Sequence, residues 1–285
     1  GSPFNVRWGD YSSAMTDPVN DIDFWTIQEY ALDQREIFGP GMFAGLWSTW
    51  WALIKPSTSS GTYGYGTGLI ISEFRMRGPA GPRDEFVELI NPTDEPITVF
   101  SSDGSDGWTL AHSNPAGTIT VLATIPNGTV IPARGHYLIT NEVRAAGIAP
   151  YSLSLNPTGN PVRTADSDAM WTPDVADNGG FAIFRTANPA NFILATRMDA
   201  AGFSTLPAGS IYREGNGLPP CAGAPAPGEQ VSFTRKGTAG TPQDTNANEN
   251  DFNYVSSTGA SAQVCQPLSP GTPTPLNLDS PPSAP

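Results

Sequence analysis

Alternating acidic and amide side chains in the segment DTNANEND are the first candidates for chemistry. Asp244, Asn246 and Asn248 occupy every second position, which is the spacing with which an EF-hand loop begins to supply oxygen ligands to Ca²⁺. The sixth position of such a loop is a glycine that permits a sharp turn, and this chain has Glu249 there. The segment therefore predicts either a structural calcium site or a turn in which the Asp and Asn side chains cap backbone amides.

Other titratable residues do not form a catalytic pattern. Asp84, Glu85 and Glu88 are close in sequence, but on a strand Asp84 and Glu88 would share one face and Glu85 would lie on the other. This arrangement gives no special support to paired-carboxylate catalysis. His112 and His136 lie near the ends of expected strands, where we expect ordinary turn or surface histidines.

Catalytic motifs with a known mechanism are missing from the sequence. It contains no HExxH zinc motif, no GxSxG nucleophile elbow, no Walker loop and no glycine-rich dinucleotide fingerprint. No other cofactor is expected either. We therefore predict that the chain is not an enzyme.

The two cysteines, Cys221 and Cys265, are 44 positions apart in segments rich in Pro, Gly, Ala and Ser. Neither has a CxxC partner or a nearby histidine, so the pattern disfavours a zinc site. We predict a disulfide between them in an oxidising, extracellular setting. The alternative is two free thiols in a cytosolic protein.

The charge balance excludes two classes of partner. The net charge is -13 and the isoelectric point is about 4.4, so phosphate backbones and anionic membrane surfaces are repelled. No apolar run approaches the roughly 18 residues that span a bilayer. We expect neither nucleic-acid binding nor membrane insertion.

The elements that position these residues are expected to be strands. Glycine and proline fill 59 of 285 positions, and short alternating segments recur between turn signals. In LIISEFRM, strict alternation places Ile70, Phe74 and Met76 on one face and Glu73 with Arg75 on the other. The pattern predicts an all-β sandwich.

Composition divides the chain into four parts. Residues 1–58 carry three expected strands, 59–67 form a flexible linker, 68–265 form the sandwich, and 266–285 form a Pro-rich tail that cannot build a core. Because such a tail has no means of ordering itself, we expect a neighbouring subunit to hold it.

Aromatic residues provide the remaining functional signs. Five of the seven tryptophans lie within the range 1–55: Trp8, Trp25, Trp47, Trp50 and Trp51. A segment of that size cannot bury them alone, so Trp47, Trp50 and Trp51 are candidates for an assembly surface. Trp171 lies in a long loop, 144–178, and is a candidate platform for carbohydrate or protein, whereas Trp108 is expected in the core.

Four phrases, in order, resemble the lamin-tail domain, an immunoglobulin-like β-sandwich of nuclear lamins and many bacterial secreted proteins. They are LIISEFRMRGPAGPRDEFVELINPTDEPITV, GWTL, IPNGTVIPARGHYLIT and GTPQDTNANENDF. The resemblance extends from Gly68 to about Ser256 and implies an immunoglobulin-like β-sandwich from a secreted or cell-surface bacterial protein. Loops 101–128 and 144–178 depart from the shorter family domain, so the resemblance implies nothing about them.

The segment 1–55 resembles the last strands of a sialidase-like, BNR-type β-propeller through RWGDYSSAMTDPVNDIDFW and WSTWWALI. The likeness covers about one blade, so no catalytic residue is carried over. The start inside a strand-rich segment favours a fragment of a larger precursor over a chain that has lost a signal peptide.

Three functions remain open at this point. The first is a non-catalytic structural or assembly module that engages other chains, including copies of itself, as a filament or surface-layer subunit. The second is an accessory C-terminal module of a larger secreted propeller hydrolase. The third is a carbohydrate-binding module.

Overall fold

The protein was studied as a computed structural model that describes most of the chain. The described residues are 12–16, 24–36, 43–54, 68–141, 154–155, 161–162, 167–238, 240–259, 263–265 and 267–284. The chain divides into two compact units, Gly1–Ser60 and Gly61–Pro285. Nearly all regular structure in the described residues is β, as expected from the sequence. No helix in these residues is long and apolar enough to cross a membrane.

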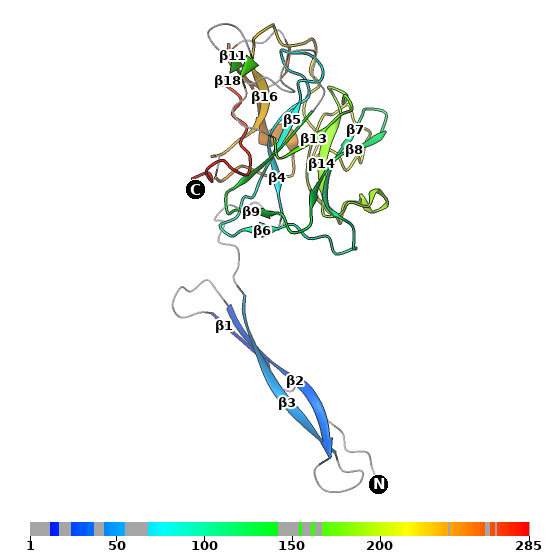
Figure 1. Cartoon of the computed structure of the whole chain (residues 1–285), viewed down its shortest axis with the longest axis vertical. Helices are drawn as coiled ribbons and strands as arrows, with labels where there is room; N and C mark the ends of the chain where they lie inside the picture. Colours follow the sequence, from blue (N-terminus) through cyan, green and yellow to red (C-terminus); the bar gives the residue numbers. More distant parts are fainter. Residues whose placement is uncertain are drawn as a thin grey trace. The chain divides into compact units, whose positions relative to one another are not determined.

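The first unit contains a three-stranded antiparallel sheet, drawn in blue in Figure 1. Its strands, in spatial order, are β1 (Ser12–Thr16), β2 (Phe24–Glu36) and β3 (Phe43–Ile54). The three strands expected from the sequence are therefore present. The register pairs Trp25 with Leu53 and Ile27 with Trp51, and it shifts between Ala31 and Asp33.

The second unit is built on a seven-stranded sheet. Its strands, in spatial order, are β13 (Ala169–Trp171), β10 (His136–Asn141), β5 (Phe86–Ile90), β4 (Ile70–Arg75), β16 (Val231–Arg235), β17 (Phe252–Ser256) and β18 (Leu268–Pro270). The two outermost pairs, β13 with β10 and β18 with β17, are parallel, and the other neighbours are antiparallel.

A four-stranded sheet and several short elements complete this unit (Figure 1). The sheet contains, in spatial order, β15 (Arg197–Gly202), β14 (Gly180–Phe184), β7 (Gly107–Ser113) and β8 (Ile119–Pro126). The short elements are β6 (Ile97–Thr98), β9 (Val130–Ile131), β11 (Ser154–Leu155), β12 (Pro161–Val162), the 3₁₀ turn η1 (Pro189–Asn191) and the helical turn α1 (Asn248–Asp251).

Apolar side chains of the two large sheets form one shared core. Phe74 of β4 meets Phe181 of β14 edge to face, with ring centroids 5.9 Å apart. Phe74 also stacks on Phe233 of β16 at 5.0 Å. Trp108 is buried in the same core, as expected, and its indole Nε1 donates to the Phe100 carbonyl. Burying large aromatic rings between two layers is the main apolar stabilisation of this unit.

The prediction that side chains alternate strictly along β4 is wrong, because the strand contains a β-bulge. The register with β5 shifts between Ile71 and Glu73, so one residue is added on β4. Ile71 rather than Ile70 joins Phe74 and Met76 in the core cluster. A bulge changes which residues face inward because the side-chain period of a strand is two.

The Pro-rich tail is ordered by its own domain, which corrects the expectation that a neighbouring subunit must hold it. Strand β18 adds to the edge of β17, and residues 271–284 continue along the unit (Figure 1, red). Pro273, Pro275 and Asn277 are buried. An extended segment that is already stiff loses little entropy on docking, and polar groups of the sheet bind its amides, as described below.

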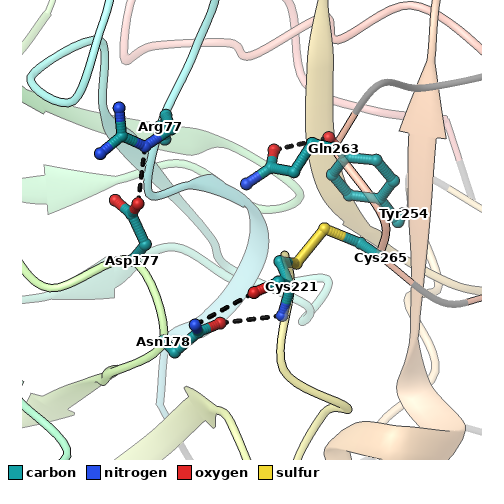
Figure 2. The surroundings of a disulfide bond; sticks show 7 residues. All are labelled: Arg77, Asp177, Asn178, Cys221, Tyr254, Gln263 and Cys265. Atoms are coloured by element: carbon teal, nitrogen blue, oxygen red, sulfur yellow. Dashed lines mark hydrogen bonds and ion pairs between the residues drawn. A yellow bond between two sulfur atoms is a disulfide. The ribbon is translucent and has the colours of Figure 1, made fainter. Parts of the chain in front are cut away.

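Cys221 and Cys265 form the predicted disulfide (Figure 2). Their Cα atoms are 4.6 Å apart, within the range that a disulfide spans. The neighbouring residues Ala222 and Val264 exchange two backbone hydrogen bonds, and the Asn178 amide bonds both backbone groups of Cys221. The bond therefore anchors the segment that leads into β18.

A cavity of about 10 Å³ lies beside the disulfide, between Arg77, Asp177, Tyr254 and Gln263 among other residues. Figure 2 shows these side chains, with Arg77 paired to Asp177 and the Tyr254 hydroxyl bound to Gln263. A space of this size holds about one water molecule. It is too small for a substrate.

Removing the disulfide tests its contribution to stability. We expect Cys221→Ser with Cys265→Ser to lower the free energy of unfolding by about 4 kcal/mol, since the unfolded chain regains the entropy of a 44-residue loop. Urea denaturation of the variant and the oxidised wild type measures the difference. Equal midpoints and slopes would contradict the expectation, and the reduced wild type is the control.

Candidate functional site

The loop before α1 does not assemble the calcium ligands expected from its spacing. The Asn248 carbonyl oxygen accepts from the backbone N–H groups of Gly202 and Glu214, and its amide donates to the Ala200 carbonyl. No lone pair of that oxygen remains for a cation. Asn246 adopts a left-handed φ of 54°, a conformation that Asn tolerates. Of the three expected ligands, only Asp244 lies in a carboxylate cluster.

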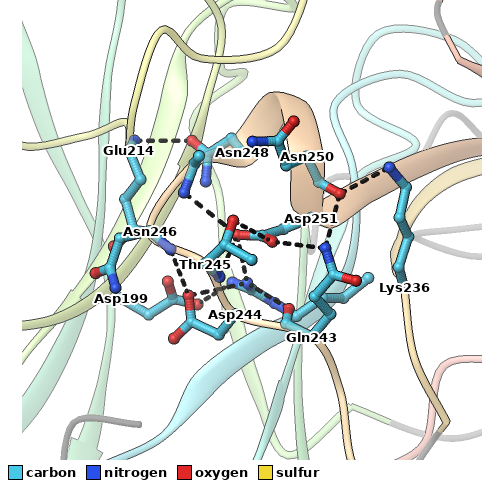
Figure 3. Close-up of polar contacts among 12 residues, drawn as sticks. Asp199, Glu214, Lys236, Gln243, Asp244, Thr245, Asn246, Asn248, Asn250 and Asp251 are labelled. Atoms are coloured by element: carbon cyan, nitrogen blue, oxygen red, sulfur yellow. Dashed lines mark hydrogen bonds and ion pairs between the residues drawn. The ribbon is translucent and has the colours of Figure 1, made fainter. Parts of the chain in front are cut away.

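Arg235 contacts three carboxylates of this region, those of Asp199, Asp244 and Asp251. Figure 3 shows these carboxylates and the loop before α1. The Arg235 side chain is fully buried at the end of β16, where Nη2 contacts Asp199 Oδ2 at 2.6 Å. Nη1 lies 3.4 Å from Asp244 Oδ1 and 3.6 Å from Asp251 Oδ2. The guanidinium carbon lies over the Phe252 ring, 4.5 Å from its centroid. Burial alone would lower the pKa of Arg235, but the surrounding carboxylates, with Asp199 first, raise it.

Asp251 holds the shape of the loop. Its carboxylate accepts from the backbone N–H groups of Thr245 and Ala247 and from the Thr245 hydroxyl. Asp244 accepts from the Asn246 N–H two residues later, as in an Asx-turn. The turn interpretation of this segment therefore accounts for these contacts, and it brings Asp244 next to Arg235.

Three buried carboxylates meet beside Arg235. Asp199 of β15, Glu214 of a loop and Asp244 each offer one oxygen, and these oxygens lie within 4.8 Å of one another. Burial, followed by the charge of Asp199, raises the pKa of Glu214 to about 9 and that of Asp244 to about 6. Glu214 Oε1 lies 2.9 Å from Arg197 Nη2. We call Asp199, Glu214 and Asp244 the acidic triad.

Two members of the acidic triad, Asp199 and Glu214, were not predicted from the sequence. Asp199 interrupts an apolar strand between Met198 and Ala200, which is a weak signal because a charged residue there requires a buried partner. Glu214 lies in a glycine-containing turn segment and carried no signal at all. Only folding brings these two residues together with Asp244.

A second set of carboxylates, which we call the acid ladder, binds the tail. The ladder is Glu73 of β4, Glu88 of β5 and Asp168 before β13. They accept from the backbone N–H groups of tail residues 274, 276 and 278 respectively. Every second N–H of this tail segment is therefore satisfied by a carboxylate.

The acid ladder also explains why polar residues of the sheet are buried. Glu73 and Glu88 face each other in the β4–β5 register, and each is only 4% exposed. Burial, then the charge of Glu88, raises the pKa of Glu73 to about 8. His136 Nδ1 lies 3.2 Å from Glu88 Oε1, and His136 Nε2 is hydrogen-bonded to the Ser283 hydroxyl.

The remaining sequence candidates separate in space. Asp84 pairs with Arg75, and Glu85 accepts from the Asn141 amide and the Val175 N–H, so neither forms a pair with Glu88. His112 and His136 are 2% exposed, which corrects the expectation of turn or surface histidines. Both are buried because their strand ends are covered by other segments.

Tryptophan placement corrects one further expectation. Trp171 is 2% exposed in the shared core, because β13 pairs with β10 and carries it inward. It is therefore not an exposed binding platform. Trp47, Trp50 and Trp51 lie on β3, but their side chains fall outside the described residues.

Comparison with known proteins gave no match among protein-family models, curated proteins or solved structures.

The acid ladder predicts a pH-dependent stability. Glu73 titrates with a pKa near 4.5 in the unfolded chain and near 8 in the folded one, so between these values the folded state binds more protons. Stability then falls as pH rises from about 5 to about 8, by at most about 1.4 kcal/mol per pH unit for this group. We expect Glu73→Gln to remove this part of the slope.

The measurement is urea denaturation at several pH values, with Glu95→Gln as the matched control at an exposed position. The amide of the replacement can still bond Ser232 and the Thr274 N–H, the two partners of Glu73. An unchanged pH slope in Glu73→Gln would show that this carboxyl does not carry the raised pKa.

Proposed function

We propose that this chain is a non-catalytic extracellular module that engages other protein chains, including copies of itself, through the three-stranded sheet of its first unit. The supporting observation is the architecture of that sheet. The described residues give one layer, with β2 and β3 paired over most of their length. A single layer has two faces to cover, and a sheet is stable only when its apolar face packs on a second layer.

The register places apolar residues on a common face of this sheet. Trp47 and Trp51 occupy positions four apart on β3, which fall on the same face of a strand, and they pair with Ala31 and Ile27. The Trp51 and Ile27 pair is followed two residues along by Trp25 and Leu53 on the same face. Tryptophan is enriched where proteins meet, so this face is the assembly surface that we propose.

The tail is not part of the proposed assembly surface, because it is bound to the seven-stranded sheet of the second unit. The disulfide supports an extracellular setting. For the second unit we propose the immunoglobulin-like arrangement of a lamin-tail domain. Two sheets packed around a shared core support this proposal, because an immunoglobulin-like domain is a sandwich of two sheets.

The same sheet supports a second candidate, an accessory module of a secreted propeller hydrolase. A propeller blade is a four-stranded antiparallel sheet, so three antiparallel strands in sequence order would supply most of one blade. In that case the second layer is a neighbouring blade of the same polypeptide, and the purified chain stays monomeric.

Two tryptophan variants test the assembly surface. We expect the wild-type chain to self-associate with rising concentration and Trp47→Ser with Trp51→Ser to remain monomeric, because the double change removes apolar area from one face. Trp50→Ser, which alters the opposite face of β3 in the register, is the matched control and should still associate. Sedimentation velocity measures the states.

A wild-type chain that is monomeric at every concentration would refute self-assembly and favour the accessory module. Association that both variants retain equally would place the contact elsewhere on the molecule.

A further inference from the structure

The acidic triad has the spacing of a cation site. Calcium binds carboxylate oxygens at about 2.3–2.6 Å, so two oxygens on one ion are separated by at most about twice that distance. The oxygens of Asp199, Glu214 and Asp244 lie within 4.8 Å of one another. One ion therefore reaches all three without a large movement of the backbone.

The charges around the triad are unbalanced. Among the described residues, the cluster brings four carboxylates, the triad and Asp251, together with two guanidinium groups, those of Arg197 and Arg235. With every group ionised, the surplus is two negative charges in a region shielded from water. A surplus of this kind is costly unless a proton or a cation offsets it.

An unsatisfied oxygen provides the second, independent observation. The Glu214 side chain is only 2% exposed. Its Oε1 binds Arg197, whereas its Oε2 is buried and has no hydrogen-bond partner among the described residues. Buried polar atoms without a partner are rare in proteins and point to a bound water or ion. Both oxygens of Asp251, in contrast, accept hydrogen bonds: Oδ2 from the Thr245 and Ala247 N–H groups, and Oδ1 from the Thr245 hydroxyl and the Gln243 side-chain amide.

Among the side chains that the structure describes, the arginines contact only one oxygen of each carboxylate in the triad. The Arg235 guanidinium binds the Oδ2 atom of Asp199 and lies near the Oδ1 atom of Asp244. The other oxygen of each carboxylate does not contact this guanidinium. Asp199 Oδ1 also accepts from the N–H of the next residue, which leaves it a second lone pair. Arg197 contacts only Glu214 Oε1 among the triad oxygens in the described residues. Each of the three carboxylates therefore retains one oxygen beyond its arginine contact.

We propose that a divalent cation, with Ca²⁺ preferred, binds between Asp199, Glu214 and Asp244. The donors are all carboxylate oxygens, which favours Ca²⁺, Mg²⁺ or Mn²⁺ over the softer metals. Calcium is preferred because Mg²⁺ keeps several waters, and the triad is buried. The ion joins β15, the Glu214 loop and the loop before α1, so it acts as a structural staple between the two sheets.

The test is calorimetric titration of the chelator-treated full chain with CaCl₂ and separately with MgCl₂, together with thermal unfolding. We expect calcium to bind with a stoichiometry near one and to raise the melting temperature, with a weaker magnesium effect. Glu214→Gln should weaken calcium binding about tenfold or more, since the affinity of such sites depends on ligand charge. Glu95→Gln is the control for a carboxylate removed from the exposed surface.

Two outcomes overturn the proposal. In the first, the wild-type chain does not bind calcium, and protons then offset the surplus charge. In the second, Glu214→Gln binds calcium as tightly as the wild type. Circular dichroism shows whether each variant is folded. If Glu214→Gln does not fold, Asp244→Asn replaces it under the same criteria.

Discussion

The buried ion pair between Arg235 and Asp199 is the interaction on which the second unit depends. Arg235 lies on β16 of the seven-stranded sheet and Asp199 on β15 of the four-stranded sheet, at 2.6 Å with both side chains fully buried. Asp199 also accepts from the Ile71 N–H of β4, so one carboxylate joins strands of both sheets. Breaking such a pair leaves a buried charge without a partner, which typically costs about 3–5 kcal/mol.

The structure around this pair follows from the need to satisfy a buried guanidinium. Its five N–H donors require acceptors, and the Ile71 and Gln243 carbonyls supply two of them. The loop before α1 is turned so that Asp244 and Asp251 approach the same group. Because two of the carboxylates that surround the guanidinium also lie close to Glu214, they form the acidic triad with it.

The tail covers polar residues on the second face of the seven-stranded sheet. One face packs on the shared core, and the other carries Glu73, Glu88 and His136, all nearly inaccessible to water. Proline lacks an N–H group, and the residues that follow Pro273 and Pro275 donate their N–H groups to Glu73 and Glu88 of the acid ladder. The polar face of the sheet supplies hydrogen-bond acceptors and the proline-rich segment supplies the matching donors.

The all-β class, the three strands of the first unit and the disulfide could be predicted from the residues alone, because alternation and turn residues act locally and two cysteines leave one possible pairing. The bulge that brings Ile71 into the core, the burial of Trp171, the docking of the tail and the meeting of the acidic triad could not. These features join residues far apart in the chain, such as Glu73 and Thr274, which are 201 positions apart. Their contact energy exists only once the sheets have formed, so no local pattern encodes it.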